Sequence, residues 1–269
     1  SNKLGCIVVV VPRMEQRLQA FSCIAMCMGL KTILFMGIIA RQSIKGTIVT
    51  YLGVAIGFIT TFFVLTRFLS AEEIGLARVL VDAATLFIGL AQLGTSSSII
   101  RFYPYFKDKE QGDHGFFFWT LCVPFIGFLL FSLIYWACSV PLCQWFSEKS
   151  PLFVDYYYMV LPIAFFMLYQ TIFETNANVL MRIVVPRAVR EVFVRIGMLV
   201  IYLLYAFRIL SMDGFVIAIS LVYALATLIN IVYLWYGGRI SLRVDWAFLR
   251  ANKQVVRNYL LYTAFLVIS

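Results

Sequence analysis

The sequence predicts an all-α, polytopic membrane protein, and two observations carry this prediction. Hydrophobic residues make up 62% of the chain and charged residues only 13%, with a mean hydropathy of +0.92. Segments without any Asp, Glu, Lys or Arg recur at 46–66, 83–100, 115–147, 156–173 and 214–238. A helix of about 20 apolar residues crosses a bilayer. A buried helix of a soluble protein would explain one such segment, but a series of them indicates membrane spans.

Positively charged residues lie mainly on one side of these spans. The net charge of +9 does not indicate nucleic-acid binding, because the basic residues flank apolar segments as the positive-inside rule requires. The turns expected outside hold only Arg67, Lys149 and Arg208. The other side holds Arg41, Lys45, Arg101, Lys107, Lys109, Arg182, Arg187, Arg190, Arg195, Arg239, Arg243, Arg250, Lys253 and Arg257. We therefore predict that the residues preceding the first helix are cytoplasmic.

A short external turn joins the first two predicted helices. The first is expected over Gly46–Thr66, with small residues on one face that allow close approach of a neighbouring backbone, at Gly46, Gly53 and Gly57. Ser70 and Glu73 match the capping box, in which each side chain accepts a hydrogen bond from the other residue's backbone N–H. The second helix is expected to begin there and to continue to about Ile100.

Four further helices follow from apolar length. Three are clear and are expected at 116–138, 156–180 and 214–238. Residues 140–155, which contain Pro141 and Pro151, are expected to form an external loop. The remaining helix has an uncharged centre of only 196–207, so it must extend over about 192–210, with its arginines reaching the interface.

These elements predict the domain organisation. Residues 1–35 do not fit the pattern and are expected to be foreign to the working protein, with Met36 as the natural start; an extra helix or a re-entrant segment is the competing interpretation. Residues 36–238 are predicted to form a lobe of six transmembrane helices. Residues 239–257 place basic and apolar side chains on different faces, which is typical of a helix lying in the membrane interface. Residues 258–269 are the expected start of a seventh helix.

Arg78 and Asp82 lie one turn apart in the second helix, near the middle of the bilayer. Ionisable groups at that depth require a partner or a water-filled cavity. One interpretation is a structural ion pair. The other is that Arg78 faces a cavity and binds an anionic substrate through its guanidinium group, while Asp82 holds it in place or titrates with a coupling ion.

Polar residues recur every four positions in the fourth helix, at Gln170, Glu174, Asn178 and Arg182. Such a stripe points toward other helices or water. Hydrogen bonding between helices, with Glu174 pairing to Arg182, is one interpretation. The other is a transport role, with Gln170 and Asn178 binding substrate and Glu174 coupling to a proton or sodium ion.

Glu191 and Arg195 form a further pair one turn apart, at the inner end of the fifth helix. An arginine that extends to the membrane surface is the preferred explanation there.

The sequence offers no recognisable enzyme site. His114 is the only histidine, and the six cysteines show no spacing typical of a metal site. We find no nucleophile–base pair and no phosphate-binding glycine loop. The sequence therefore predicts neither a metal nor a cofactor, and it does not indicate an enzyme.

Several segments resemble the polysaccharide flippase branch of the multidrug/oligosaccharidyl-lipid/polysaccharide exporter superfamily. The basic start MGIIARQSIKG at 36–46 leads directly into the first helix. RFLSAEEIGLARVL at 67–80 and LGTSSSIIRFYPYF at 93–106 are similar to the family's first external turn and second-helix exit. RVDWAFLRANKQVVRNYLLYTAF at 243–265 is similar to the segment that joins its two halves.

The resemblance implies a MATE-like transporter with two lobes around a central cavity, of which this chain holds the first and the start of the second. It implies flipping of an undecaprenyl-linked oligosaccharide to the periplasmic leaflet of the bacterial inner membrane, in O-antigen or capsule biosynthesis, and a missing C-terminal lobe that activity requires. A multidrug exporter of the same superfamily is one alternative. A membrane-embedded glycan polymerase or glycosyltransferase is the alternative from another class.

Overall fold

The structure is a computed structural model, and it describes residues 42–106, 115–147, 150–237, 254, 257–259 and 261–263. The chain divides into two compact units, Ser1–Thr47 and Ile48–Ser269. Residues 42–47 of the first unit are helical. The expected extension 1–35 and nearly all of the expected interlobe linker 239–257 lie outside the described residues.

The described part of the chain confirms the predicted all-α membrane bundle. Within the described residues, five helices are long and apolar enough to cross a membrane: Gln42–Phe68, Ala71–Ala91, Phe116–Ala137, Tyr157–Val179 and Met212–Tyr236. Their outward faces carry large apolar side chains, with Phe62 61%, Leu86 75% and Leu133 68% exposed. Water would penalise such surfaces, whereas lipid acyl chains cover them without a comparable cost.

The helix α3 (Ala71–Ala91) begins at the predicted capping box. The Ser70 side chain accepts a hydrogen bond from the Glu73 backbone N–H at 3.3 Å, and the Glu73 carboxylate accepts from the Ser70 N–H at 2.8 Å. The Tyr205 hydroxyl also donates to Glu73. The capping box therefore connects the N-terminal end of α3 to the C-terminal end of α10 (Val194–Ala206).

Substituting Ser70→Ala should lower the free energy of unfolding by about 1 kcal/mol, because one helix N–H loses its acceptor. Thr85→Ala on the same helix is the control, since the Thr85 hydroxyl bonds only the Val81 carbonyl of its own helix in the structure. Unfolding in mixed micelles of increasing SDS content, followed by circular dichroism, measures both variants. Equal stability of the two variants would contradict the capping assignment.

The second predicted helix does not continue unbroken to Ile100, and that expectation is wrong. It stops after Ala91, and α4 (Thr95–Phe106) begins after a turn in which Leu93 and Gly94 adopt positive φ angles of 49° and 65°. Gly127 of α5 (Phe116–Ala137) lies against the Ala91 carbonyl and Leu93 at this turn. The close approach of two helix backbones thus coincides with the break.

The expected external loop 140–155 contains two short helices, α6 (Ser139–Ser147) and α7 (Pro151–Asp155). The turn η2 (Tyr157–Met159) then leads into α8 (Val160–Val179). Tyr157 is only 2% exposed, and its ring stacks on Tyr135 with centroids 4.2 Å apart. Each of these tyrosines donates a hydrogen bond to the other's backbone carbonyl. This aromatic pair anchors the start of α8 to the end of α5.

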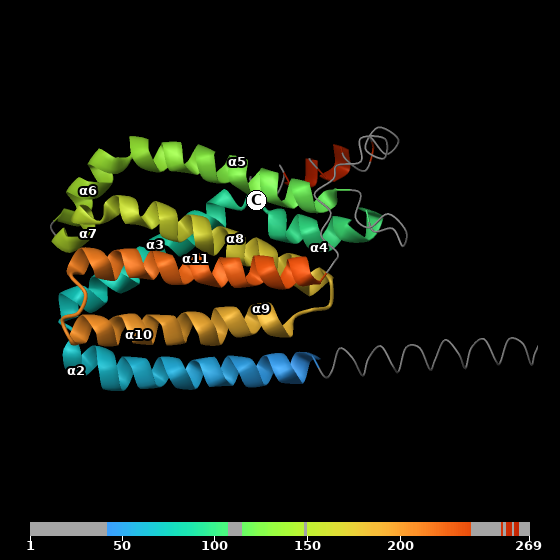
Figure 1. Cartoon of the computed structure of the whole chain (residues 1–269). Coiled ribbons are helices and arrows are strands. Elements are labelled where there is room, and N and C mark those ends of the chain that lie inside the picture. Colours follow the sequence, from blue (N-terminus) through green and yellow to red (C-terminus); the bar gives the residue numbers. More distant parts are fainter. Residues whose placement is uncertain are drawn as a thin grey trace, which may run out of the picture. The chain divides into compact units, whose positions relative to one another are not determined.

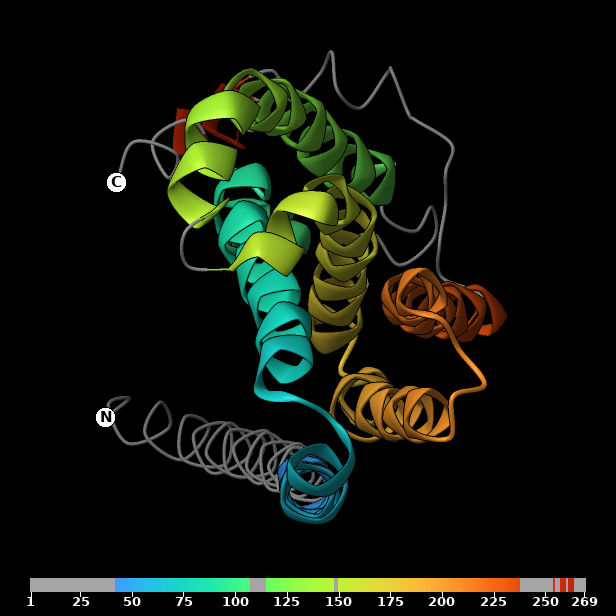
Figure 2. The same cartoon turned by 90° about the vertical axis from the view of Figure 1, so that its left-hand side faces the viewer.

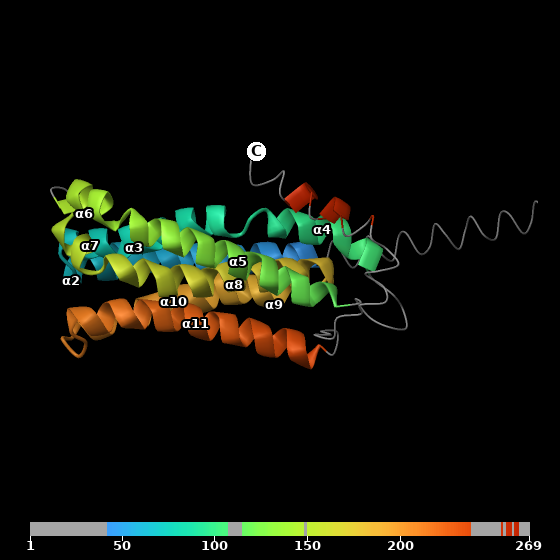
Figure 3. The ribbon, with the colours of Figure 1, turned by 90° about the horizontal axis from the view of Figure 1, so that it is seen from above.

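The helix α8 is the central element of the second unit. It packs against α3, α4, α5 and α11 (Met212–Tyr236), and it lies between α5 and α11 in Figures 1 and 3. Figure 2, an end-on view, shows α3 beside it. Fully buried aliphatic residues fill these contacts, among them Leu80, Ala84, Ile163, Leu168 and Ile219. Most faces of α8 are therefore covered by other helices.

The expected fifth helix begins at Val184, earlier than the start near residue 192 that the sequence predicts. It runs through α9 (Val184–Ala188), the π-helical segment η3 (Val189–Phe193) and α10, and it ends at Ala206 rather than near Leu210. Its role as a sixth membrane crossing stays a prediction. The described residues 257–259 and 261–263, at the expected start of the seventh helix, are helical.

Candidate functional site

A cavity of about 430 Å³ opens among the helices of the second unit. The first helix, α3, α8, the η3–α10 segment and α11 all contribute to its wall. Its lining includes a group of polar and charged side chains: Thr60, Arg78, Gln170, Arg190, Glu191 and Arg195. Three arginines therefore line one cavity within an apolar bundle, where charged side chains need partners or water.

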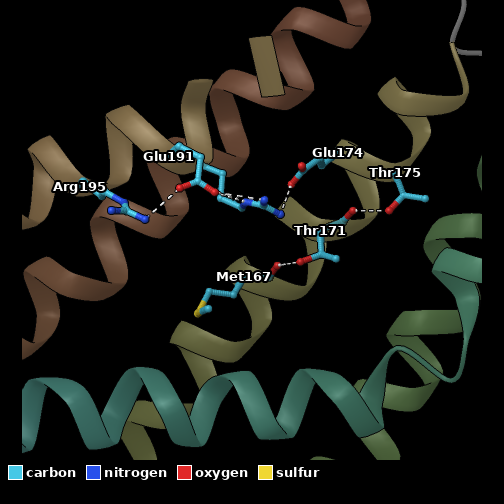
Figure 4. A network of polar contacts seen from close by, with 7 residues as sticks. Met167, Thr171, Glu174, Thr175, Glu191 and Arg195 are labelled. Carbon is cyan, nitrogen blue, oxygen red and sulfur yellow. Dashed lines mark hydrogen bonds and ion pairs between the residues drawn. The ribbon is translucent and has the colours of Figure 1, made fainter. Parts of the chain in front are cut away.

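A chain of ion pairs runs along one side of this cavity. Arg190 donates to Glu174 at 3.0 Å and to Glu191 at 3.2 Å. Arg195 donates to the other oxygen of Glu191 at 3.0 Å and to the Gly53 carbonyl at 2.8 Å. In Figure 4, dashed lines from Glu174 on α8 and from Glu191 on η3 lead to the guanidinium between them, which belongs to Arg190. The network joins α8, η3, α10 and the first helix.

Two π-helical segments contribute to the cavity, and π-helical turns are frequent at functional sites. The first, η1 (Thr60–Leu65), contributes Thr60, and η3 contributes Arg190 and Glu191.

Glycines allow the first helix to approach this network, as the predicted small-residue face requires. A Cβ atom at Gly53 would lie 2.5 Å from the Glu191 carbonyl oxygen, and one at Gly57 would lie 2.8 Å from the Arg195 guanidinium. Any larger side chain at Gly53 would displace backbone.

The structure brings some of the predicted site residues together and leaves others apart. Arg78 and Gln170 line the cavity, and Glu174 reaches its edge through Arg190. Asp82 is exposed, and the structure records no ion pair between it and Arg78. Asn178, two turns below Gln170, is partly buried and is not among the lining residues.

One expected pairing requires correction. Glu174 pairs with Arg190 and not with Arg182, whose guanidinium lies 5.9 Å from the Tyr233 ring centroid. Arg195 pairs with Glu191 as the spacing predicts, and it also bonds the first helix and lines the cavity. Its extension to the membrane surface stays a prediction.

Sequence reasoning counted Arg190 only as a topological signal and missed its place in the site. The Glu191–Arg195 spacing was visible in the sequence, whereas the Glu174–Arg190 pair joins residues 16 apart and follows no helical period.

The cavity holds a polar group without a partner. Gln170 is 4% exposed, and its Nε2 forms no hydrogen bond in the structure. The neighbouring Thr171 and Thr175 hydroxyls instead donate to carbonyls of α8 itself, those of Met167 and Thr171 (Figure 4). A buried amide donor without an acceptor is costly, so Gln170 is available to bind a ligand oxygen.

The comparison with known families agrees with these features. A family profile described as "Polysaccharide biosynthesis protein" matches residues 39–269. No match was found among curated proteins or among solved structures. With its helical membrane bundle and this match over most of its length, the chain belongs to the polysaccharide biosynthesis protein family, a flippase family of the multidrug/oligosaccharidyl-lipid/polysaccharide exporter superfamily.

Proposed function

We propose that this protein moves lipid-linked oligosaccharide or polysaccharide precursors from the cytoplasmic to the periplasmic leaflet of a bacterial inner membrane. The observation that carries the proposal is the arginine-lined cavity inside the membrane bundle of a polysaccharide biosynthesis protein. A lipid-linked glycan combines a diphosphate, sugar hydroxyls and an apolar tail, and undecaprenyl diphosphate is the carrier that the resemblance implies.

The side chains of the cavity match this substrate chemistry. The Arg78 guanidinium offers paired donors that suit phosphate oxygens. The unpaired Gln170 Nε2 suits a phosphate or sugar oxygen. A volume of about 430 Å³ is in the range of small-molecule sites, so the cavity admits the diphosphate and adjoining sugar while the lipid tail stays in the bilayer.

The alternating-access step requires a second lobe, which the resemblance implies beyond the first. Within the first lobe, the distribution of basic residues supports a cytoplasmic start of the first helix. The chain connection after α8 is assigned to the same cytoplasmic side, and η3, which forms part of the cavity wall, follows that connection.

A multidrug exporter and an enzyme fit the site less well. Exporters of cationic drugs need acidic cavities, whereas Arg78, Arg190 and Arg195 outnumber the one acidic lining residue, Glu191. An enzyme needs a nucleophile or an acid–base pair at the cavity, and we assign none among its lining residues.

Substituting Arg78→Ala in the full-length gene should reduce surface polysaccharide by about tenfold, because one charge-assisted hydrogen bond contributes roughly 1.5–3 kcal/mol. The assay is complementation of a flippase-deficient strain at matched protein levels. Arg67→Ala is the control, since Arg67 is exposed in α2 (Thr66–Phe68), outside the cavity. If the Arg78→Ala variant and the Glu174→Ala variant each give a normal amount of surface polysaccharide, the cavity assignment is refuted.

A further inference from the structure

Arg190 is shared by two carboxylates that differ in what else binds them. Its guanidinium contacts Glu174 at 3.0 Å and Glu191 at 3.2 Å. Glu191 has a second cationic partner, Arg195, at 3.0 Å. Among the described residues, Arg190 is the ion-pair partner of Glu174. Loss of Arg190 would therefore leave Glu191 paired and Glu174 unpaired.

Arg190 is also accessible to a ligand. Its side chain is 49% exposed and lines the cavity. A guanidinium carries five N–H donors, and a phosphate group with up to two negative charges attracts it more strongly than a single carboxylate does. An anion that enters the cavity thus competes with Glu174 for Arg190.

Glu174 has little access to solvent. Its side chain is 7% exposed, and it lies in a helix packed on several sides. The charged groups that act on it are Arg190 and Arg187, which favour its ionised form, and Glu191, which opposes that form. An ionised carboxylate buried in an apolar bundle without a close cation is strongly disfavoured, and such groups bind a proton instead.

We infer that the cavity couples anion binding to proton uptake: Arg190 passes from Glu174 to the phosphate of the ligand, and Glu174 takes one proton from water. Glu191 stays ionised, because Arg195 remains beside it. This inference rests on the proposed function, in which the ligand is a lipid-linked diphosphate, and it identifies Arg190 as the residue that links substrate to the coupling ion.

The direction of the pH effect follows from linkage. Since the bound state holds one proton more than the free state, lower pH strengthens binding. For each unit by which the pH is lowered, the dissociation constant should fall by up to roughly tenfold. This holds over the pH range in which Glu174 is ionised in the ligand-free protein and protonated in the complex.

The test is isothermal titration calorimetry of the full-length protein with farnesyl diphosphate, a short lipid diphosphate, in buffers of different ionisation enthalpy. The number of protons taken up per bound ligand is the readout. Wild type should take up about one proton more than Glu174→Gln, which keeps the side-chain shape without the charge. Protonation changes of the diphosphate itself are common to both proteins and cancel in this difference.

Glu191→Gln is the matched control, because it also removes a carboxylate contact to Arg190 but should keep the proton uptake. Equal uptake by wild type and Glu174→Gln, with binding retained, would overturn the inference and leave the proposed function intact. Loss of the uptake in Glu191→Gln would likewise overturn the assignment to Glu174. Failure of the wild type to bind the diphosphate would overturn both.

A measurement on wild type alone covers the case in which Glu174→Gln does not fold. Sulfate keeps a constant charge between pH 6 and 8, so its binding reports only protein protons. We expect sulfate to displace farnesyl diphosphate with a dissociation constant that falls as pH falls and with proton uptake. Binding of sulfate without proton uptake would exclude the coupling.

Discussion

Replacing Arg190 with alanine should destabilise the protein by about 3 kcal/mol, because it leaves a buried carboxylate without its cation. The Glu174 side chain is only 7% exposed, and among the described residues it forms its ion pair with Arg190. The same change removes one bond between α8 and η3, so these elements should separate more readily. We therefore expect a lower unfolding midpoint and a large loss of polysaccharide transport.

Thermal unfolding in detergent, followed by size-exclusion chromatography of the remaining folded protein, measures this effect. Arg187→Ala is the control, because it also removes a positive charge that acts on Glu174 but breaks no ion pair between the described residues, so its effect should be much smaller. Adding Glu174→Gln to Arg190→Ala should restore much of the lost stability, since the unpaired charge is gone. Equal effects of Arg187→Ala and Arg190→Ala would contradict the buried pair.

Replacing Gly127 with valine should destabilise the bundle by about 2–3 kcal/mol through overpacking. Even a Cβ atom at this position would collide with the Ala91 backbone carbonyl and would lie 2.9 Å from Leu93 side-chain atoms. Neither neighbour can move freely, because both belong to the turn that ends α3. The substitution should force α5 away from the α3–α4 break.

Gly89→Val provides the comparison, since a Cβ at Gly89 meets no atom within 4 Å. It lies on the exposed face of α3, so valine there should change stability little. Unfolding in SDS mixed micelles again gives the free energies. Similar values for the two variants would show that the α3–α5 contact is looser than the structure indicates.

Much of the fold was predictable because it depends on properties local to the chain. Apolar length places four of the five candidate spans within a few residues of their expected positions, and the exception is the second, which ends at Ala91 instead of near Ile100. The capping box at Ser70 and the Glu191–Arg195 pair were predictable for the same reason, since a helix fixes the distance between residues three or four apart.

The site was predictable only in part. The sequence singled out Arg78, Gln170 and Glu174 as polar groups at membrane depth, and all three lie at or beside the cavity. It also predicted Asp82 and Asn178 as site residues, because spacing along a helix does not show which neighbouring helix each face contacts. Their roles in binding or coupling stay predictions.

The sequence by itself determined most of the helices and their apolar lengths, because each follows from the composition of one segment, and it predicts the sidedness of the basic residues. Only the tertiary structure decided that Arg190 and not Arg182 partners Glu174, that Tyr157 is buried against Tyr135, and that the second helix breaks at Leu93–Gly94. Each of these depends on which surfaces of two distant segments meet, and that is set by the packing of whole helices against one another.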